Sequence, residues 1–303
     1  MNTNVITPEM LASSVIAVPP LARDADLKIC ATENAKVIRH LEAGGVRTLL
    51  YGGNAVFYHI ALAEFADSLT MLRDHAGADT TVIPSVGPAF GTALDQAAVL
   101  REFDFPTAMV LPARDIATPK GVATGIRKFA EAYGNPIVLY IKFEGYLEPE
   151  HARALMDDGV VSWIKYAIVR DDPAHDDYLR QLVDCVDPKR IVSGIGEQPA
   201  IVHLRDFGVQ GFTSGCVCVA PSLSMKMLTA LRAGDDETAE TIRQTFEPLE
   251  DFRNAIHPIR VLHAAVAEAG IADTGPILPL LNDVNRDERA KIAQAAKTLL
   301  AHN

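Results

Sequence analysis

One lysine of the chain, Lys165, occupies a position where its amine could act as a nucleophile. It directly follows Ser162-Trp163-Ile164, part of an apolar run of the length expected for a buried strand. Taking an ammonium group out of water lowers its pKa, and the free amine can then attack a carbonyl carbon. We therefore predict that Lys165 ends a buried strand and is a candidate for the nucleophile of a covalent reaction.

A second lysine, Lys142, has a similar environment in the sequence. Side chains alternate along a strand, so Tyr140 and Lys142 share a face, and both point inward if Tyr140 does. A second cation close to Lys165 would lower the pKa of its amine further. We expect one lysine to be the nucleophile and the other to bind a carboxylate, and the spacing alone does not choose between them.

The elements that must position these residues form a regular series. Eight short apolar runs start 20–33 residues apart, a spacing typical of one strand followed by one helix. Most of them are apolar on both faces, as parallel strands covered by helices are. The predicted strands are Val15–Val18, Thr48–Tyr51, Thr81–Ser85, Ala108–Leu111, Ile137–Ile141, Val161–Ile164, Ile191–Ser193 and Gly211–Ser214.

The segments between these runs have the apolar spacing of amphipathic helices, and glycines such as Gly134, Gly208 and Gly234 follow several of them. A chain of 303 residues can form two domains of about 150 residues or one barrel of about 250 with an appendage. Eight strand–helix units without a GxGxxG motif favour a (β/α)8 TIM barrel over 1–234. Residues 235–303 are helical in pattern throughout and are predicted to form a C-terminal helical extension of the same unit.

The active site of such a barrel lies at the carboxyl ends of its strands. Besides the two lysines and Tyr140, this rule selects Gly53 and Asn54 after the second strand, Arg114 after the fourth and Thr213 in the eighth. Glycines at 194 and 196, together with Ser214-Gly215, could instead build a phosphate site, which would suit a phosphosugar aldolase or isomerase.

Composition limits the classes of partner. The chain has 28 Lys and Arg against 39 Asp and Glu, a net charge of −11, which argues against binding to nucleic acid or to an anionic membrane. No apolar run is long enough for a transmembrane helix, and no signal peptide is expected. The histidines and the four scattered cysteines form no metal-binding motif, so we expect no metal, no cofactor and a cytoplasmic protein with reduced thiols.

The order of these residues along the chain resembles a known superfamily. Gly52-Gly53-Asn54 after the second strand, Leu139-Tyr140 in the fifth, Ile164-Lys165 in the sixth and Gly211-Phe212-Thr213-Ser214 in the eighth are similar to motifs of the dihydrodipicolinate synthase and N-acetylneuraminate lyase superfamily. The resemblance covers essentially the whole chain. Members are class I, Schiff-base lyases with a (β/α)8 barrel and a C-terminal helical extension.

The resemblance implies roles for individual residues. Lys165, rather than Lys142, would form an imine with pyruvate or another 2-keto acid, and Tyr140 would transfer protons. Gly53 and Asn54 would bind the keto-acid carboxylate, and the Thr213 carbonyl would line the floor of the site. The reaction would be aldol cleavage or condensation, or dehydration of a sugar acid. The family also implies a homo-oligomer, a dimer or a tetramer.

The chain departs from the family pattern at several positions. The motif Gly-Thr-Thr-Gly-Glu is Gly52-Gly53-Asn54-Ala55-Val56 here, a variant closer to the sugar-acid dehydratases of the family. Ala113-Arg114 replaces a pair of tyrosines, and Gly145 replaces an arginine that binds a substrate carboxylate. Lys142 and Arg114 could therefore receive an acidic substrate tail. The losses also leave open a barrel that binds a keto acid without turnover.

Overall fold

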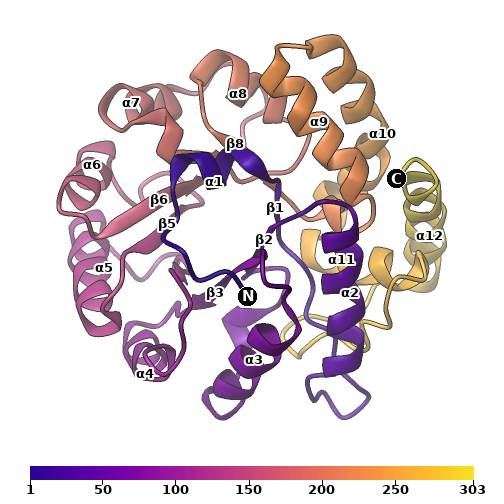
Figure 1. Ribbon diagram of the computed structural model, residues 1–303, viewed down its shortest axis with the longest axis horizontal. Helices are drawn as coiled ribbons and strands as arrows, with labels where there is room; N and C mark the ends of the chain where they lie inside the picture. The colour runs from indigo at the N-terminus through magenta and orange to yellow at the C-terminus, as the bar shows by residue number, and fades with distance from the viewer.

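The computed structural model describes all 303 residues and contains a closed barrel of eight parallel strands, paired in chain order from β1 to β8 (Figure 1). Each strand overlaps one of the predicted apolar runs, so the predicted (β/α)8 fold is confirmed. The strands are β1 (Ile16–Ala17), β2 (Thr48–Tyr51), β3 (Thr81–Val86), β4 (Met109–Val110), β5 (Ile137–Ile141), β6 (Val161–Tyr166), β7 (Ile191–Ser193) and β8 (Gly211–Ser214).

A ring of helices covers the outside of the barrel (Figure 1). It consists of α2 (Ala31–Ala43), α3 (Leu62–His75), α4 (Phe90–Leu100), α5 (Pro119–Tyr133), α6 (Pro149–Asp157), α7 (Asp177–Cys185), α8 (Ala200–Phe207) and α9 (Pro221–Ala233). Three 3₁₀ turns interrupt the connections: η1 (Phe57–His59), η2 (Pro188–Arg190) and η3 (Cys216–Cys218). The apolar faces of the eight helices point to the strands, because parallel strands need cover on both faces.

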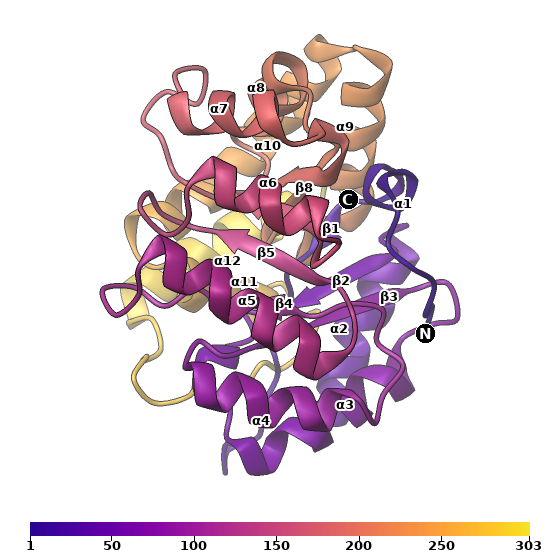
Figure 2. The ribbon, with the colours of Figure 1, turned by 90° about the vertical axis from the view of Figure 1, so that its left-hand side faces the viewer.

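Two features differ from the sequence prediction. A short helix, α1 (Pro8–Ser13), was not predicted. It lies close to the start of β8: a Cβ added to Gly211 would be only 2.8 Å from the Leu11 carbonyl oxygen. In Figure 2 the arrowhead of β5 points away from α1, so α1 lies at the amino-terminal end of the barrel. In addition, β6 extends to Tyr166, which places Lys165 within the strand rather than after it.

The C-terminal extension consists of α10 (Asp236–Ala255), α11 (Pro258–Glu268) and α12 (Arg286–Leu300). Helix α10 packs against α8, α9 and η3 of the barrel and against α11 and α12, and its Phe246 and Leu249 are buried. Burying aromatic and aliphatic side chains of this size stabilises the contact by about 1.5–3 kcal/mol for each one. We propose that the extension and the barrel fold as one unit.

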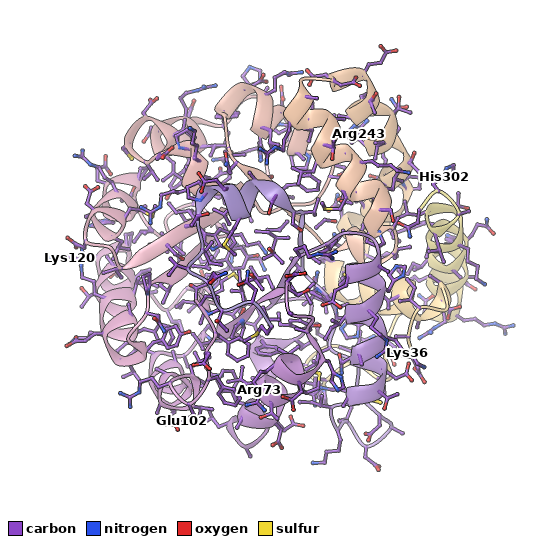
Figure 3. All side chains as sticks on the ribbon, viewed as in Figure 1. Lys36, Arg73, Glu102, Lys120, Arg243 and His302 are labelled. Carbon is purple, nitrogen blue, oxygen red and sulfur yellow. The ribbon has the colours of Figure 1, made fainter.

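Polar and apolar side chains are separated as this architecture requires. The side chains of Lys120, Glu102 and His302 lie at the outer edge of the molecule, whereas side chains fill the centre of the barrel (Figure 3). Trp163, Tyr51 and other large side chains are fully buried in the core. None of the helices combines the length and the apolar character needed to cross a membrane.

Candidate active site

A pocket of about 260 Å³ lies at the carboxyl ends of the strands and combines residues from the barrel and from the extension. Six residues predicted from the sequence line it: Gly53, Asn54, Tyr140, Lys142, Lys165 and Thr213. The closure of the barrel brings these positions together, although they are spread over 160 residues of the chain. The lining also contains Arg253, Asn254 and His257 of the extension.

Lys165 has the environment of a reactive amine. It is only 4% exposed and pairs with Tyr140 across the β5–β6 register, with its Nζ 4.6 Å from the centre of the tyrosine ring. Burial, and then the nearby charges of Lys142 and Arg253, lower the pKa of Lys165 to about 7. A substantial fraction of the amine is therefore unprotonated and nucleophilic near neutral pH.

The strand beside Lys165 leaves space for its aliphatic stem. A Cβ on Gly194, the residue after β7, would lie 2.7 Å from the Tyr166 carbonyl oxygen and 3.0 Å from Cγ of Lys165. The Gly194 N–H also donates to that carbonyl, at 2.6 Å. A side chain at position 194 would therefore displace the lysine, and glycine is the residue that fits here.

Tyr140 faces the same pocket. Unlike the hydroxyls of Tyr133 and Tyr178, which donate to backbone carbonyls, the Tyr140 hydroxyl has no hydrogen-bond partner in the chain. Burial, followed by the neighbouring Tyr58, raises the pKa of Tyr140 well above its usual value, so the hydroxyl keeps its proton. A protonated phenol beside the Lys165 amine can donate a hydrogen bond to a bound carbonyl, or pass a proton to it.

Lys142 and Arg114 occupy different places. Lys142 lines the exposed mouth of the pocket, with its Nζ 5.8 Å from the Tyr58 ring and 5.9 Å from the Tyr140 ring. Desolvation, and then Arg114, lower the pKa of Lys142. Arg114 does not line the pocket: its exposed guanidinium stacks on the Phe143 ring, 4.3 Å from the centre. The structure therefore does not bring Arg114 to the position predicted for it.

The loop of Gly53 and Asn54 is fixed by its own hydrogen bonds. Asn54 Nδ2 donates to the Val18 carbonyl at 2.8 Å, and the Asn54 backbone carbonyl pairs with Nε2 of His263 at 2.9 Å. The backbone N–H groups of Gly53 and Asn54 have no partner in the chain. Two unpaired donors therefore belong to a loop that lines the pocket. The Thr213 carbonyl already accepts a hydrogen bond from the Gly196 N–H, at 3.0 Å.

The place considered for a phosphate after β7 and β8 is filled by two buried carboxyl groups. Glu197 accepts hydrogen bonds from Ser214 and Ser224, both at 2.7 Å, and Glu250 of α10 accepts from the N–H groups of Glu197 and Gln198. Burial raises the pKa of Glu197 and of Glu250, the latter also through its neighbour Glu197. Acidic side chains on these N–H groups disfavour a phosphate there.

Sequence reasoning missed the contribution of the extension. Arg253 and Asn254 near the end of α10, and His257 before α11, line the pocket with the residues of the strands. No motif marks them, because their position depends on how α10 packs against the barrel. Nowhere does the chain gather three or more His, Cys, Asp or Glu side chains in an arrangement that could hold a metal ion.

The pKa of Lys165 predicts a pH dependence of its reactivity. With the pKa lowered to about 7, the free amine increases as the pH rises through 7, so reaction with pyruvate should accelerate from pH 6 to 8 and then level off. Lys142→Gln removes a neighbouring cation, so the rising limb should move to higher pH. The measurement is the rate of borohydride-trapped adduct formation against pH. If the labelling rate instead rises near the ordinary pKa of lysine, and at the same pH in Lys142→Gln, this electrostatic explanation is wrong.

Known proteins similar to this chain agree on one family. Residues 12–299 match the family model described as the Dihydrodipicolinate synthetase family. A protein of Rhizobium rhizogenes named a probable 5-dehydro-4-deoxyglucarate dehydratase is 23% identical over 302 residues, which cover 96% of this chain and 97% of that protein. A second protein of that name, from Streptomyces coelicolor, is 22% identical and covers 96% and 90% of the two chains.

Solved structures share the fold. Dihydrodipicolinate synthase from Bacillus clausii superposes with a TM-score of 0.85 at 20% identity, covering 96% of this chain and 98% of that one. A prophage protein of the dihydrodipicolinic acid synthase family from E. coli K12, in complex with pyruvate, gives 0.82 at 20% identity and covers 94% and 98%. The predicted resemblance and the predicted enzyme class, a Schiff-base lyase, are confirmed. The chain belongs to the dihydrodipicolinate synthetase family.

Proposed function

We propose that this protein is a Schiff-base dehydratase that removes water from a deoxy keto sugar diacid, with Lys165 as the nucleophile. The observation that supports it most is the buried Lys165 amine, with a pKa near 7, in a pocket that it shares with Tyr140. The relatives named as 5-dehydro-4-deoxyglucarate dehydratases indicate the substrate class.

The named compound suits this chemistry. It has a ketone next to one carboxylate, then a CH2 group, then a carbon bearing a hydroxyl. The Lys165 amine adds to the ketone, and water leaves to give an imine. Loss of a proton from the CH2 group forms an enamine, and its electrons expel the hydroxyl, which leaves as water after it takes up a proton. Tyr140 is positioned to transfer these protons. Hydrolysis of the imine then regenerates the amine.

The mouth of the pocket suits the second carboxylate of a diacid. Lys142 is exposed there, beside Tyr58 and Tyr140, and its ammonium can attract the distal carboxylate. Arg114, stacked on Phe143, adds positive charge near Lys142 without lining the pocket. An acidic protein with a net charge of −11 needs such local cations, because its overall field repels anions.

The test is incubation with 5-dehydro-4-deoxyglucarate, followed by mass spectrometry of the products. We expect the substrate to be consumed and the product to lack the elements of water. Release of pyruvate instead would show aldol cleavage and contradict the dehydratase assignment. An imine trapped with borohydride, without turnover of this or other sugar acids, would show a barrel that binds keto acids but does not convert them.

We further propose a homo-oligomer, a dimer or a tetramer, in the cytoplasm. An apolar pocket of about 690 Å³ between α4 and α5 supports oligomerisation, and Phe90 and Ile116 beside it are exposed by 48% and 82%. Four unpaired cysteines suit a reducing compartment. Sedimentation velocity should show a dimer or a larger species, and a monomer at micromolar concentration would contradict it. Cell fractionation tests the location.

A further inference from the structure

Arg253 is a cation that the mechanism above does not use. It comes from the last turn of α10 in the extension and lines the pocket of Lys165. None of the ion pairs of the chain includes it, and its Nε donates a hydrogen bond to the Pro258 carbonyl at 3.3 Å. The Cys216 thiol lies next to its guanidinium. Most of its donors are therefore left for a ligand.

The guanidinium lies beside the loop of Gly53 and Asn54. A Cβ on Gly215 would stand 2.8 Å from Arg253 Nη2 and 3.0 Å from Asn54 Nδ2, so both groups border the same small space. The unpaired N–H groups of Gly53 and Asn54 belong to this loop. Glycine at 215 keeps the space open, and a side chain there would displace the guanidinium. The Arg253 guanidinium and the loop that carries these N–H groups thus border one part of the pocket.

The charge of Arg253 is retained in this setting. Burial acts against the guanidinium charge, but Cys216, Glu250 and Glu197 outweigh it and raise the pKa of Arg253. The two glutamates are themselves buried, with raised pKa values, and neither forms an ion pair with Arg253. After burial and Lys142, Arg253 is also one of the groups that lower the pKa of Lys165, as expected for a cation close to the reacting amine.

We propose that Arg253 binds the carboxylate next to the ketone of the substrate, together with the N–H groups of Gly53 and Asn54. This inference rests on the proposed function, since it takes a 2-keto acid held by Lys165 as given. A planar guanidinium can donate two parallel hydrogen bonds to a carboxylate. The guanidinium from the extension thereby takes the place of the two hydroxyl side chains of the family motif, whose positions hold Gly53 and Asn54 in this chain.

The test compares a monoacid with a diacid. Pyruvate has only the carboxylate next to its ketone, so its half-saturating concentration for borohydride-trapped labelling of Lys165 reports this subsite alone. Measured at about pH 9, above the pKa of about 7, the amine is free. Arg253→Gln should raise that concentration by about 10- to 100-fold, as expected for a lost hydrogen bond to a charged group, and leave maximal labelling unchanged.

Three further variants make the result specific. Arg253→Lys keeps the charge but loses the bidentate geometry, so its increase should be several-fold. Lys142→Gln should weaken binding of the diacid much more than binding of pyruvate, the reverse of a variant that acts on the carboxylate next to the ketone. Arg243→Gln, on the same helix but paired with Glu240 and Glu247, should have no effect on either. Thermal unfolding of each variant reports whether it is folded. If Arg253→Gln does not fold, the half-saturating concentration of Arg253→Lys tests the proposal instead.

The outcomes separate this inference from the proposed function. If wild-type protein is never labelled by pyruvate, the Schiff-base function itself is wrong. If the wild-type protein is labelled, and the folded Arg253 variants reach half-saturation at the same pyruvate concentration as wild type, then Arg253 does not bind the carboxylate. An increase for pyruvate in Lys142→Gln equal to that in Arg253→Gln would also overturn the assignment, because the two cations would then act at one subsite.

Discussion

Lys165→Ala is expected to abolish the reaction, with kcat reduced by at least about 10³-fold, because it removes the buried amine that forms the imine and leaves only Lys142, at the exposed mouth of the pocket. Borohydride with pyruvate should attach one adduct to the wild-type chain at Lys165 and none to the variant. Peptide mass mapping identifies the modified residue. Lys165→Arg should be equally inactive, since a guanidinium keeps its proton and cannot act as the nucleophile.

Lys142→Gln is the matched control for this variant. Lys142 lies in the same pocket but at its exposed mouth, whereas Lys165 is almost fully buried. The Lys142 variant should still form the adduct at Lys165, with its pH dependence moved upward. Labelling of Lys165→Ala at the wild-type level, or an adduct mapped to Lys142, would show that the wrong lysine has been assigned.

Tyr140→Phe is expected to reduce kcat by about 10²- to 10⁴-fold, the range found when a positioned acid or base is lost. The ring would remain as packing against Lys165, so binding of the keto acid and trapping of the adduct should change much less than turnover. The measurements are kcat and the half-saturating concentration, taken together with the extent of labelling.

Tyr133→Phe provides the comparison for Tyr140→Phe. The Tyr133 hydroxyl donates to the Phe105 carbonyl at 2.6 Å inside the core and does not line the pocket. Its loss should cost about 1 kcal/mol of unfolding free energy and leave kcat unchanged. Equal kcat values for wild type and Tyr140→Phe would exclude a role for the hydroxyl in proton transfer.

Much of this architecture could be predicted because its signals are local. A buried parallel strand needs apolar residues on both faces, and eight such runs at regular spacing leave few alternatives to a closed barrel. The start of a helix is harder to predict: α3 begins only at Leu62, because Val56 adopts a left-handed conformation and the chain first forms η1. Such a turn has no strong sequence signal when its residue is not glycine.

The residues of the site also fall into two groups, those that local sequence signals locate and those that they do not. Gly53, Asn54, Tyr140, Lys142, Lys165 and Thr213 could be selected from the sequence because the carboxyl end of each strand is the functional end of a barrel. Arg114 satisfied the same rule, yet its guanidinium stacks on Phe143 instead of entering the pocket. A strand end fixes where a backbone lies, whereas the competing contacts of a long side chain decide where its charged end goes.

By itself, the sequence determined the barrel, the lysine at the end of its sixth strand and the family, since each follows from residue types at short spacing. Only the tertiary structure decided which cations meet in the pocket and what occupies the space after β7. Arg253 and Glu250 come from a helix of the extension, and they reach the strand ends through the packing of α10 against α8 and α9. That packing depends on contacts between residues far apart in the chain, and no local pattern encodes such contacts.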